Sequence, residues 1–207
     1  MHLIIVSDIF GRTAALESFA SEFPGKVEII DPYNSEIMGF DCEDDAYSYF
    51  TTEVGLDVYA DKLSNRIKAS TDHVTLLGFS VGASAIWKLS NEQNLSNVVG
   101  AALFYGSQIR YYKDIEPLFP ICLVFPQTEV HFSVSEVIQS LKQKENVEIH
   151  HSSFLHGFMN YHSSNYNAAA YNKYTKALCS VPFNKTIQAT AFAALDGGVK
   201  PIGGINE

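Results

Sequence analysis

One serine of the chain stands in a pattern that favours nucleophilic chemistry. Gly78-Phe79-Ser80-Val81-Gly82 forms a G-x-S-x-G sequence, directly after an apolar run and directly before a stretch with helical spacing. A strand that turns sharply into a helix needs glycines beside the central residue, and it holds that side chain at the sheet edge. Backbone N–H groups at the start of a helix stabilise negative charge there. We therefore predict that Ser80 is a nucleophile; the alternative is a Gly-Ser turn that only caps the helix.

A serine nucleophile needs a general base, and on such a fold the acid and then the histidine follow the serine in the chain. Of the seven histidines, His156 lies just beyond a predicted strand and is the best placed, with His162 as the fallback. Glu129 is the only carboxylate in the loop after the preceding strand and would orient His156. The alternatives are a surface histidine and a solvated carboxylate near a helix start at Ser133.

An acyl-transfer site also needs two backbone donors for the developing oxyanion. The first would be the N–H of Val81, the residue after the nucleophile. The second would come from the loop Ser7-Asp8-Ile9-Phe10-Gly11, which ends the first predicted strand. The N–H groups of Ile9 and Phe10 are both candidates, and Gly11 gives this loop conformational freedom.

The elements that must position these residues alternate along the chain. Short, nearly continuous apolar runs are typical of strands covered on both faces, and the segments between them show helical spacing. This order predicts an α/β fold with a mostly parallel sheet of about six strands and helices on both faces. The expected strands are 2–7, 26–30, 73–79, 98–104, 120–125 and 147–151, and the expected helices are 12–23, 56–69, 81–91, 133–144 and 163–179.

Two long stretches lie outside this alternation. Residues 33–54 are acidic and aromatic and are predicted to be a loop that overhangs a site. Residues 182–207 are rich in Ala and Gly and are expected to form a docked helix or a flexible tail. No internal repeat or linker is evident, so we predict one domain over residues 1–181 followed by this extension.

Composition narrows the class of protein. The chain has 207 residues, of which 46% are hydrophobic, and a formal net charge of -9, so a general nucleic-acid binder with a basic surface is not expected. Its three cysteines form no disulfide framework, and none is expected to be a nucleophile. The first apolar run is too short for a signal peptide, and no run reaches the length of a membrane span. We therefore expect a cytoplasmic protein without membrane contact.

Four short segments resemble dienelactone hydrolase-like proteins of the α/β-hydrolase fold. They are Asp8-Ile9-Phe10-Gly11, Gly78-Phe79-Ser80-Val81-Gly82, Ala102-Leu103-Phe104-Tyr105-Gly106 and His156-Gly157-Phe158, in that order. The resemblance covers residues 1 to about 181. Ser80 stands where these proteins carry cysteine, and Glu129 where they usually carry aspartate. The chain also opens on the strand that ends at the oxyanion loop, which implies an N-terminally shortened sheet.

The resemblance also suggests residues on the substrate side. Family members bind a substrate carboxylate with arginines, so Arg12 and Arg110 are candidates, the alternative being solvated surface side chains. An apolar, aromatic wall is expected from Phe10, Tyr105, Tyr111 and Phe158.

These observations predict a serine hydrolase that cleaves a small-molecule ester, thioester or lactone through an acyl-enzyme. The alternative is a non-catalytic binding protein that retains the α/β-hydrolase fold. No metal motif or dinucleotide loop is present in the sequence, so no metal or other cofactor is expected. The expected partner is the small-molecule substrate, and a homodimer is left open.

Overall fold

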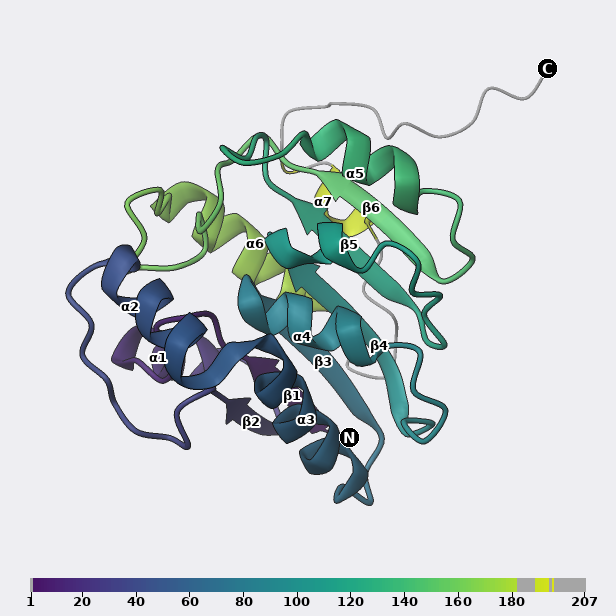
Figure 1. Cartoon of the computed structure of the whole chain (residues 1–207), viewed down its shortest axis with the longest axis horizontal. Coiled ribbons are helices and arrows are strands. Elements are labelled where there is room, and N and C mark those ends of the chain that lie inside the picture. Colours follow the sequence, from purple (N-terminus) through teal and green to yellow (C-terminus); the bar gives the residue numbers. More distant parts are fainter. Residues whose placement is uncertain (1, 182–188, 194, 196–207) are drawn as a thin grey trace.

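Six parallel strands form one sheet between two layers of helices in the computed structural model, which describes residues 2–181, 189–193 and 195 (Figure 1). All five strand pairs are parallel, and the strands follow the expected apolar runs to within one residue at each end. They are β1 (His2–Val6), β2 (Lys26–Ile30), β3 (Val74–Phe79), β4 (Val98–Phe104), β5 (Ile121–Phe125) and β6 (Val147–His151). The predicted α/β sheet of about six strands is therefore confirmed.

The strand order places the predicted chemistry at one edge of the sheet. The order is β2-β1-β3-β4-β5-β6, so the chain builds outward from β1 to β2 and then returns to add β3 on the other side. The carboxyl ends of β1 and β3 therefore lie side by side at the point where the direction of winding changes. Such a switch point is where open α/β sheets bind ligands. The loop after β1 and the turn that carries Ser80 both begin there.

Helices bury both faces of the sheet. The elements are α1 (Ala14–Ser21), α2 (Glu43–Tyr49), the π-helix η1 (Phe50–Val54), α3 (Gly55–Lys68), α4 (Val81–Leu89), the 3-10 helix η2 (Ser107–Tyr111), α5 (Val134–Leu141), α6 (Ala168–Ser180) and α7 (Thr190–Ala193). One core packs α3, α4 and α5 against the sheet, with Leu63, Trp87 and Leu141 fully buried. The opposite core packs α1, α6 and α7, with Phe19 and Tyr174 buried.

The prediction of a loop over residues 33–54 is wrong in its second half. α2 and η1 occupy Glu43 to Val54 and lead directly into α3. The acidic residues that suggested a solvated loop, Glu43, Asp44 and Asp45, form the first turn of α2. Carboxylates are favourable there because they face the positive end of the helix dipole.

The last expected helix begins later than its pattern suggested. α6 starts at Ala168, and the side chain of Asn167 caps it by accepting a hydrogen bond from the Ala170 N–H at 2.9 Å. Residues 163–167 instead form turns that close the loop after β6.

Part of the C-terminal extension is described. α7 places Phe192 in the core, stacked on Tyr174 with 5.1 Å between ring centroids. The remaining residues of the predicted extension, 182–188, 194 and 196–207, lie outside the described part of the chain. None of the described helices combines the length and the apolar character that a bilayer span requires.

Candidate active site

Ser80 sits at a strained turn between β3 and α4. Its backbone angles are φ 50° and ψ -113°, a conformation that a residue with a side chain rarely adopts. Gly82 lets the first turn of α4 pack tightly on the end of β1, because a Cβ atom there would lie 2.3 Å from the Val6 carbonyl oxygen. A Cβ atom at Gly78 would likewise lie 2.8 Å from the Ala83 backbone. Both glycines of the pattern therefore allow close packing at this turn. This packing holds the Ser80 side chain at the sheet edge.

Three of the predicted residues meet in one hydrogen-bonded chain. Ser80 Oγ lies 3.1 Å from His156 Nε2, and His156 Nδ1 lies 2.7 Å from Glu129 Oε1. The Glu129 side chain is 12% exposed and that of His156 is 30% exposed, so the carboxylate is shielded while the imidazole reaches solvent. Glu129 does not cap α5, because Ser133 takes that position and accepts a hydrogen bond from the Glu136 N–H.

Of the two predicted oxyanion donors in the loop after β1, one is already engaged. The Phe10 N–H donates to Asp8 Oδ1 at 3.0 Å, so this candidate is already used within the loop. The Ile9 carbonyl accepts a hydrogen bond from Tyr33 Oη at 2.6 Å, which fixes the orientation of the same segment. Of the predicted pair, the Ile9 N–H therefore remains the candidate, together with the N–H of Val81 in the first turn of α4.

Asp8 lies at the candidate active site, whereas the sequence alone drew attention to it only as part of a motif. Its Oδ2 accepts a hydrogen bond from Asn160 Nδ2 at 2.6 Å, which ties the loop after β1 to the loop that carries His156. Burial raises the pKa of Asp8 to about 6 and outweighs the opposing effects of the Phe10 N–H, His156 and Asn160. The repulsion of Glu43 adds to the increase. The signal in the sequence was an acidic residue at the carboxyl end of a central strand.

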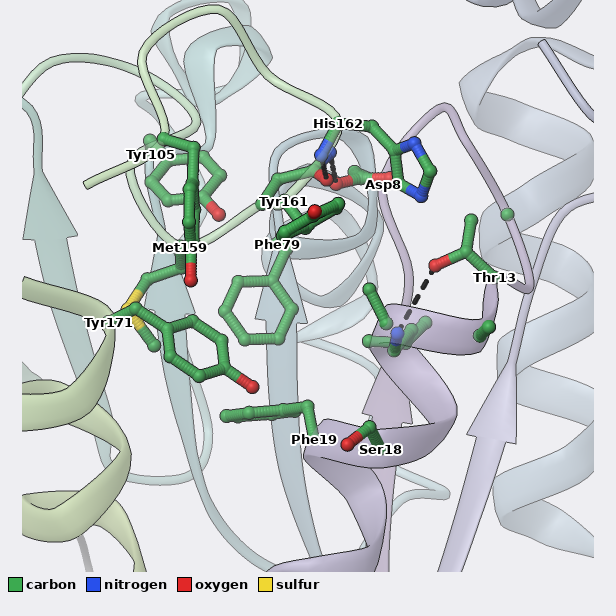
Figure 2. Close-up of a pocket in the computed structure, with 16 residues that line it drawn as sticks. Asp8, Thr13, Ser18, Phe19, Phe79, Tyr105, Met159, Tyr161, His162 and Tyr171 are labelled. Carbon is green, nitrogen blue, oxygen red and sulfur yellow. Dashed lines mark hydrogen bonds between the residues drawn. The ribbon is translucent and has the colours of Figure 1, made fainter. Parts of the chain in front are cut away.

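A cavity of about 470 Å³ adjoins these residues on the α1 side of the sheet (Figure 2). Phe79, which precedes the nucleophile, lies at its centre, and Tyr105 stands across from the loop after β1. The Tyr105 ring lies 5.0 Å from the His156 ring, measured between centroids. The lining residues are Asp8, Gly11, Thr13, Ala14, Ala15, Leu16, Ser18, Phe19, Phe79, Tyr105, Met159, Asn160, Tyr161, His162, Tyr166 and Tyr171.

Neither predicted arginine lines this cavity, although both chain neighbours of Arg12 do, and both arginines bind other groups. Arg12 pairs with Glu17 and donates to Ser35 Oγ at 3.1 Å. Arg110 donates to the Ser107 carbonyl at 2.5 Å, and its guanidinium packs over the Tyr111 ring at 4.2 Å. The structure therefore does not place either arginine where it was expected to meet a substrate carboxylate.

The predicted aromatic wall is only partly present. Tyr105 lines the cavity, whereas Phe158 is fully buried in the core behind it and Tyr111 is 67% exposed on the surface. Phe10 is buried and stacks on His162, the fallback base, with ring centroids 5.4 Å apart. His162 itself lines the cavity, and the position beside Ser80 belongs to His156.

Comparisons with solved structures show the same fold. A Klebsiella pneumoniae protein, solved as a candidate dienelactone hydrolase, superposes with a TM-score of 0.63 at 13% identity, over 81% of this chain and 80% of that chain. The dienelactone hydrolase-like promiscuous phosphotriesterase P91 from metagenomic libraries gives a TM-score of 0.52 at 13% identity, over 86% and 83%. At such low identity these likenesses concern the fold alone.

Comparisons of sequence identify the family. The uncharacterized protein YczH of Bacillus subtilis is 35% identical over 141 residues, which cover 67% of this chain and 68% of YczH. The sequence profile of the dienelactone hydrolase family matches residues 3–182. The chain therefore belongs to the dienelactone hydrolase family, and it is a hydrolase of the α/β type.

Proposed function

We propose that this protein is a serine hydrolase that cleaves a small-molecule ester, thioester or lactone. The observation that carries the proposal is the continuous contact from Ser80 Oγ through His156 to Glu129 at the carboxyl edge of the sheet. This arrangement supplies a nucleophile, a base within reach of its proton, and a carboxylate that orients the base.

Each group has one role in the proposed reaction. Ser80 Oγ bonds to the acyl carbon while His156 Nε2 takes the hydroxyl proton, and the N–H groups of Val81 and Ile9 hold the oxyanion. The bond to the leaving group breaks, and His156 returns the proton to that group. Water then attacks the acyl-enzyme with His156 as base, so the acid is released and Ser80 regains its proton. Glu129 keeps His156 in the tautomer that accepts at Nε2 and stabilises the imidazolium.

Replacement of the nucleophile is the direct test. Ser80→Ala should lower kcat/KM for short p-nitrophenyl esters by at least about 10³-fold, because the attacking oxygen is gone while the rest of the site remains. A fluorophosphonate probe should label the wild-type chain at Ser80 and leave the variant unlabelled. Ser140→Ala, a matched change on α5 whose hydroxyl bonds the Val137 carbonyl, should keep both activity and labelling.

The same experiment distinguishes the proposed hydrolase from the second function that the fold allows. Folded wild-type protein that neither turns over esters nor reacts with the probe would be a binding protein on a hydrolase fold. Full esterase activity in Ser80→Ala would instead show that another residue is the nucleophile.

A further inference from the structure

The cavity beside the nucleophile is lined by one carboxylate, Asp8, and by one imidazole, His162. Among the described residues, its lining includes neither lysine nor arginine. Most of the remaining surface is aromatic or aliphatic, from Phe19, Phe79, Tyr105, Tyr161, Tyr166 and Tyr171 together with Leu16, Met159 and alanines of α1. While the His162 imidazole is neutral, an anion bound here would lose hydration without gaining an opposite charge.

The nearest charges strengthen this effect. Glu43, at the start of α2, lies close enough to raise the pKa of Asp8, so a second carboxylate contributes to the negative potential. Arg12 and Arg110, the cations expected to oppose it, are engaged by Glu17 and by the Ser107 carbonyl. Like charges placed together in a poorly solvated site disfavour binding by several-fold to hundreds-fold.

Asp8 is also poorly placed to select a cation. Oδ1 accepts from the Phe10 N–H at 3.0 Å, and Oδ2 accepts from Asn160 at 2.6 Å. Both oxygens therefore already hold protein donors that shape the loop after β1. What the cavity offers a ligand is its apolar, aromatic surface.

Ser80, Glu129 and His156 do not themselves line the cavity, but residues beside two of them do. Phe79 is the residue before the nucleophile, and Tyr105 contacts the His156 ring. We propose that this cavity binds an uncharged, apolar portion of the substrate, so that the enzyme acts on neutral esters and rejects those carrying an anionic group at this position. This inference rests on the proposed esterase function and specifies its substrate class.

Three nearly isosteric substrates test the charge preference. They are p-nitrophenyl esters with the same acyl linker, ending in tert-butyl, trimethylammonium or sulfonate. The tert-butyl ester should exceed the sulfonate ester by about 100-fold in kcat/KM at pH 8, with the trimethylammonium ester within about tenfold of the tert-butyl ester. A sulfonate ester that matches or exceeds the neutral one would overturn the proposal, as would a preference for trimethylammonium above tenfold.

The pH dependence of the neutral-to-sulfonate ratio isolates the charge of Asp8 when it is measured in a His162→Asn variant, because the His162 imidazole also lines the cavity and can take up a proton. Protonation of His156 affects all three esters equally and cancels in the ratio, and the sulfonate stays ionised. Because the pKa of Asp8 is about 6, the neutral-to-sulfonate ratio should fall by roughly tenfold between pH 8 and pH 5. A ratio that does not change over this range would mean that Asp8 does not set the preference.

A substitution that fills the cavity tests whether the substrate binds there. Ser18 of α1 lines the cavity, whereas Ser21, one turn further on, does not. The measured quantity is kcat/KM for the tert-butyl ester divided by kcat/KM for p-nitrophenyl acetate. Ser18→Phe should lower this ratio by about tenfold, and Ser21→Phe should leave it unchanged. An equal effect of the two variants would place the substrate elsewhere.

Binding to Ser80→Ala keeps the inference independent of turnover. Calorimetric titration of this variant with the three esters should give the order tert-butyl, trimethylammonium, sulfonate. If wild-type protein turns over none of the esters, the proposed function fails while this order still decides the inference. If it turns over the sulfonate ester best and Ser80→Ala is inactive, only the inference fails.

Discussion

In the proposed reaction, Glu129 would act through His156 alone. Its carboxylate contacts Nδ1 at 2.7 Å from a largely shielded position, so its charge would favour the imidazolium formed by the proposed proton transfer from Ser80. The longer side chain of glutamate reaches this position from a residue four places after the end of β5. Its contribution therefore depends on both charge and hydrogen-bond direction.

Glu129→Gln should lower kcat/KM for p-nitrophenyl esters by about 10³–10⁴-fold, with little change in the free energy of unfolding. The amide can donate to Nδ1, which leaves the proton on Nε2 and prevents His156 from accepting the Ser80 proton. Glu129→Asp keeps the charge and should retain more activity than the glutamine variant. Glu136→Gln, an exposed change on α5, is the control for loss of an acidic side chain. Activity above one tenth of wild type in Glu129→Gln would contradict the assigned role.

The three residues of this contact chain could be predicted because each has a local signal. Ser80 lies in a strand-turn-helix pattern, and Glu129 and His156 follow the last two strands, β5 and β6. The contact between Asp8 and Asn160 had no such signal, since the two residues are 152 positions apart and both are common loop residues. The arginines were misplaced for a related reason: sequence position brings Arg12 and Arg110 near the edge, but their side chains bind Glu17 and Ser107 instead.

At the scale of elements, the site is an assembly of loops held together by asparagine side chains. Asn160 connects the loop after β6 to Asp8 in the loop after β1, and its Oδ1 accepts from the His162 N–H at 2.8 Å. Asn165 Nδ2 donates to the His156 carbonyl at 2.9 Å. These contacts hold the loop that carries His156 against the loop after β1, so we expect Asn160 to be a positioning residue.

Asn160→Ala should lower kcat by about tenfold with a smaller effect on KM, because the two loops lose their link while the contact chain itself remains. The pKa of the Asp8 carboxyl should also rise above 6, since the Asn160 hydrogen bond normally lowers it. Steady-state kinetics and a carbon-detected NMR titration of Asp8 measure the two effects.

Asn146→Ala is the matched control for this change. Asn146 donates one hydrogen bond to the Pro117 carbonyl at 2.8 Å, in the loop that leads into β6 at the opposite edge of the sheet. Both variants should lose about 1 kcal/mol of stability. Only Asn160→Ala should change kcat and the Asp8 titration, and equal kinetics in the two variants would reduce Asn160 to a structural role.

The sequence predicted the strands more accurately than it predicted α2. All six strands were located, and the four inner ones carry the nearly continuous apolar runs that a sheet covered on both faces requires. α2 was missed because its acidic first turn has the composition of a loop, and its stability depends on Ala46 and Phe50 being buried beneath it. Burial of this kind depends on tertiary contacts that short-range patterns do not contain.

At the scale of the molecule, the charge balance agrees with the site. A net charge of -9 gives an overall negative potential, and the carboxylates of Asp8, Glu43 and Glu129 place more of it at the carboxyl edge of the sheet. A substrate without negative charge meets no electrostatic barrier on approach. The whole-chain charge and the cavity lining thus favour the same class of substrate.

The core of the molecule extends beyond the predicted domain end at residue 181. Phe192 is fully buried in the α1–α6 core, stacked on Tyr174 and edge-on to Phe104 at 5.7 Å. Phe192→Ala should therefore lower the free energy of unfolding by about 3–5 kcal/mol, because it leaves a cavity that the sheet cannot close. Leu195→Ala, at a partly buried position nearby, should cost less. Urea denaturation measures both, and a loss below 1 kcal/mol for Phe192→Ala would show that folding is complete without α7.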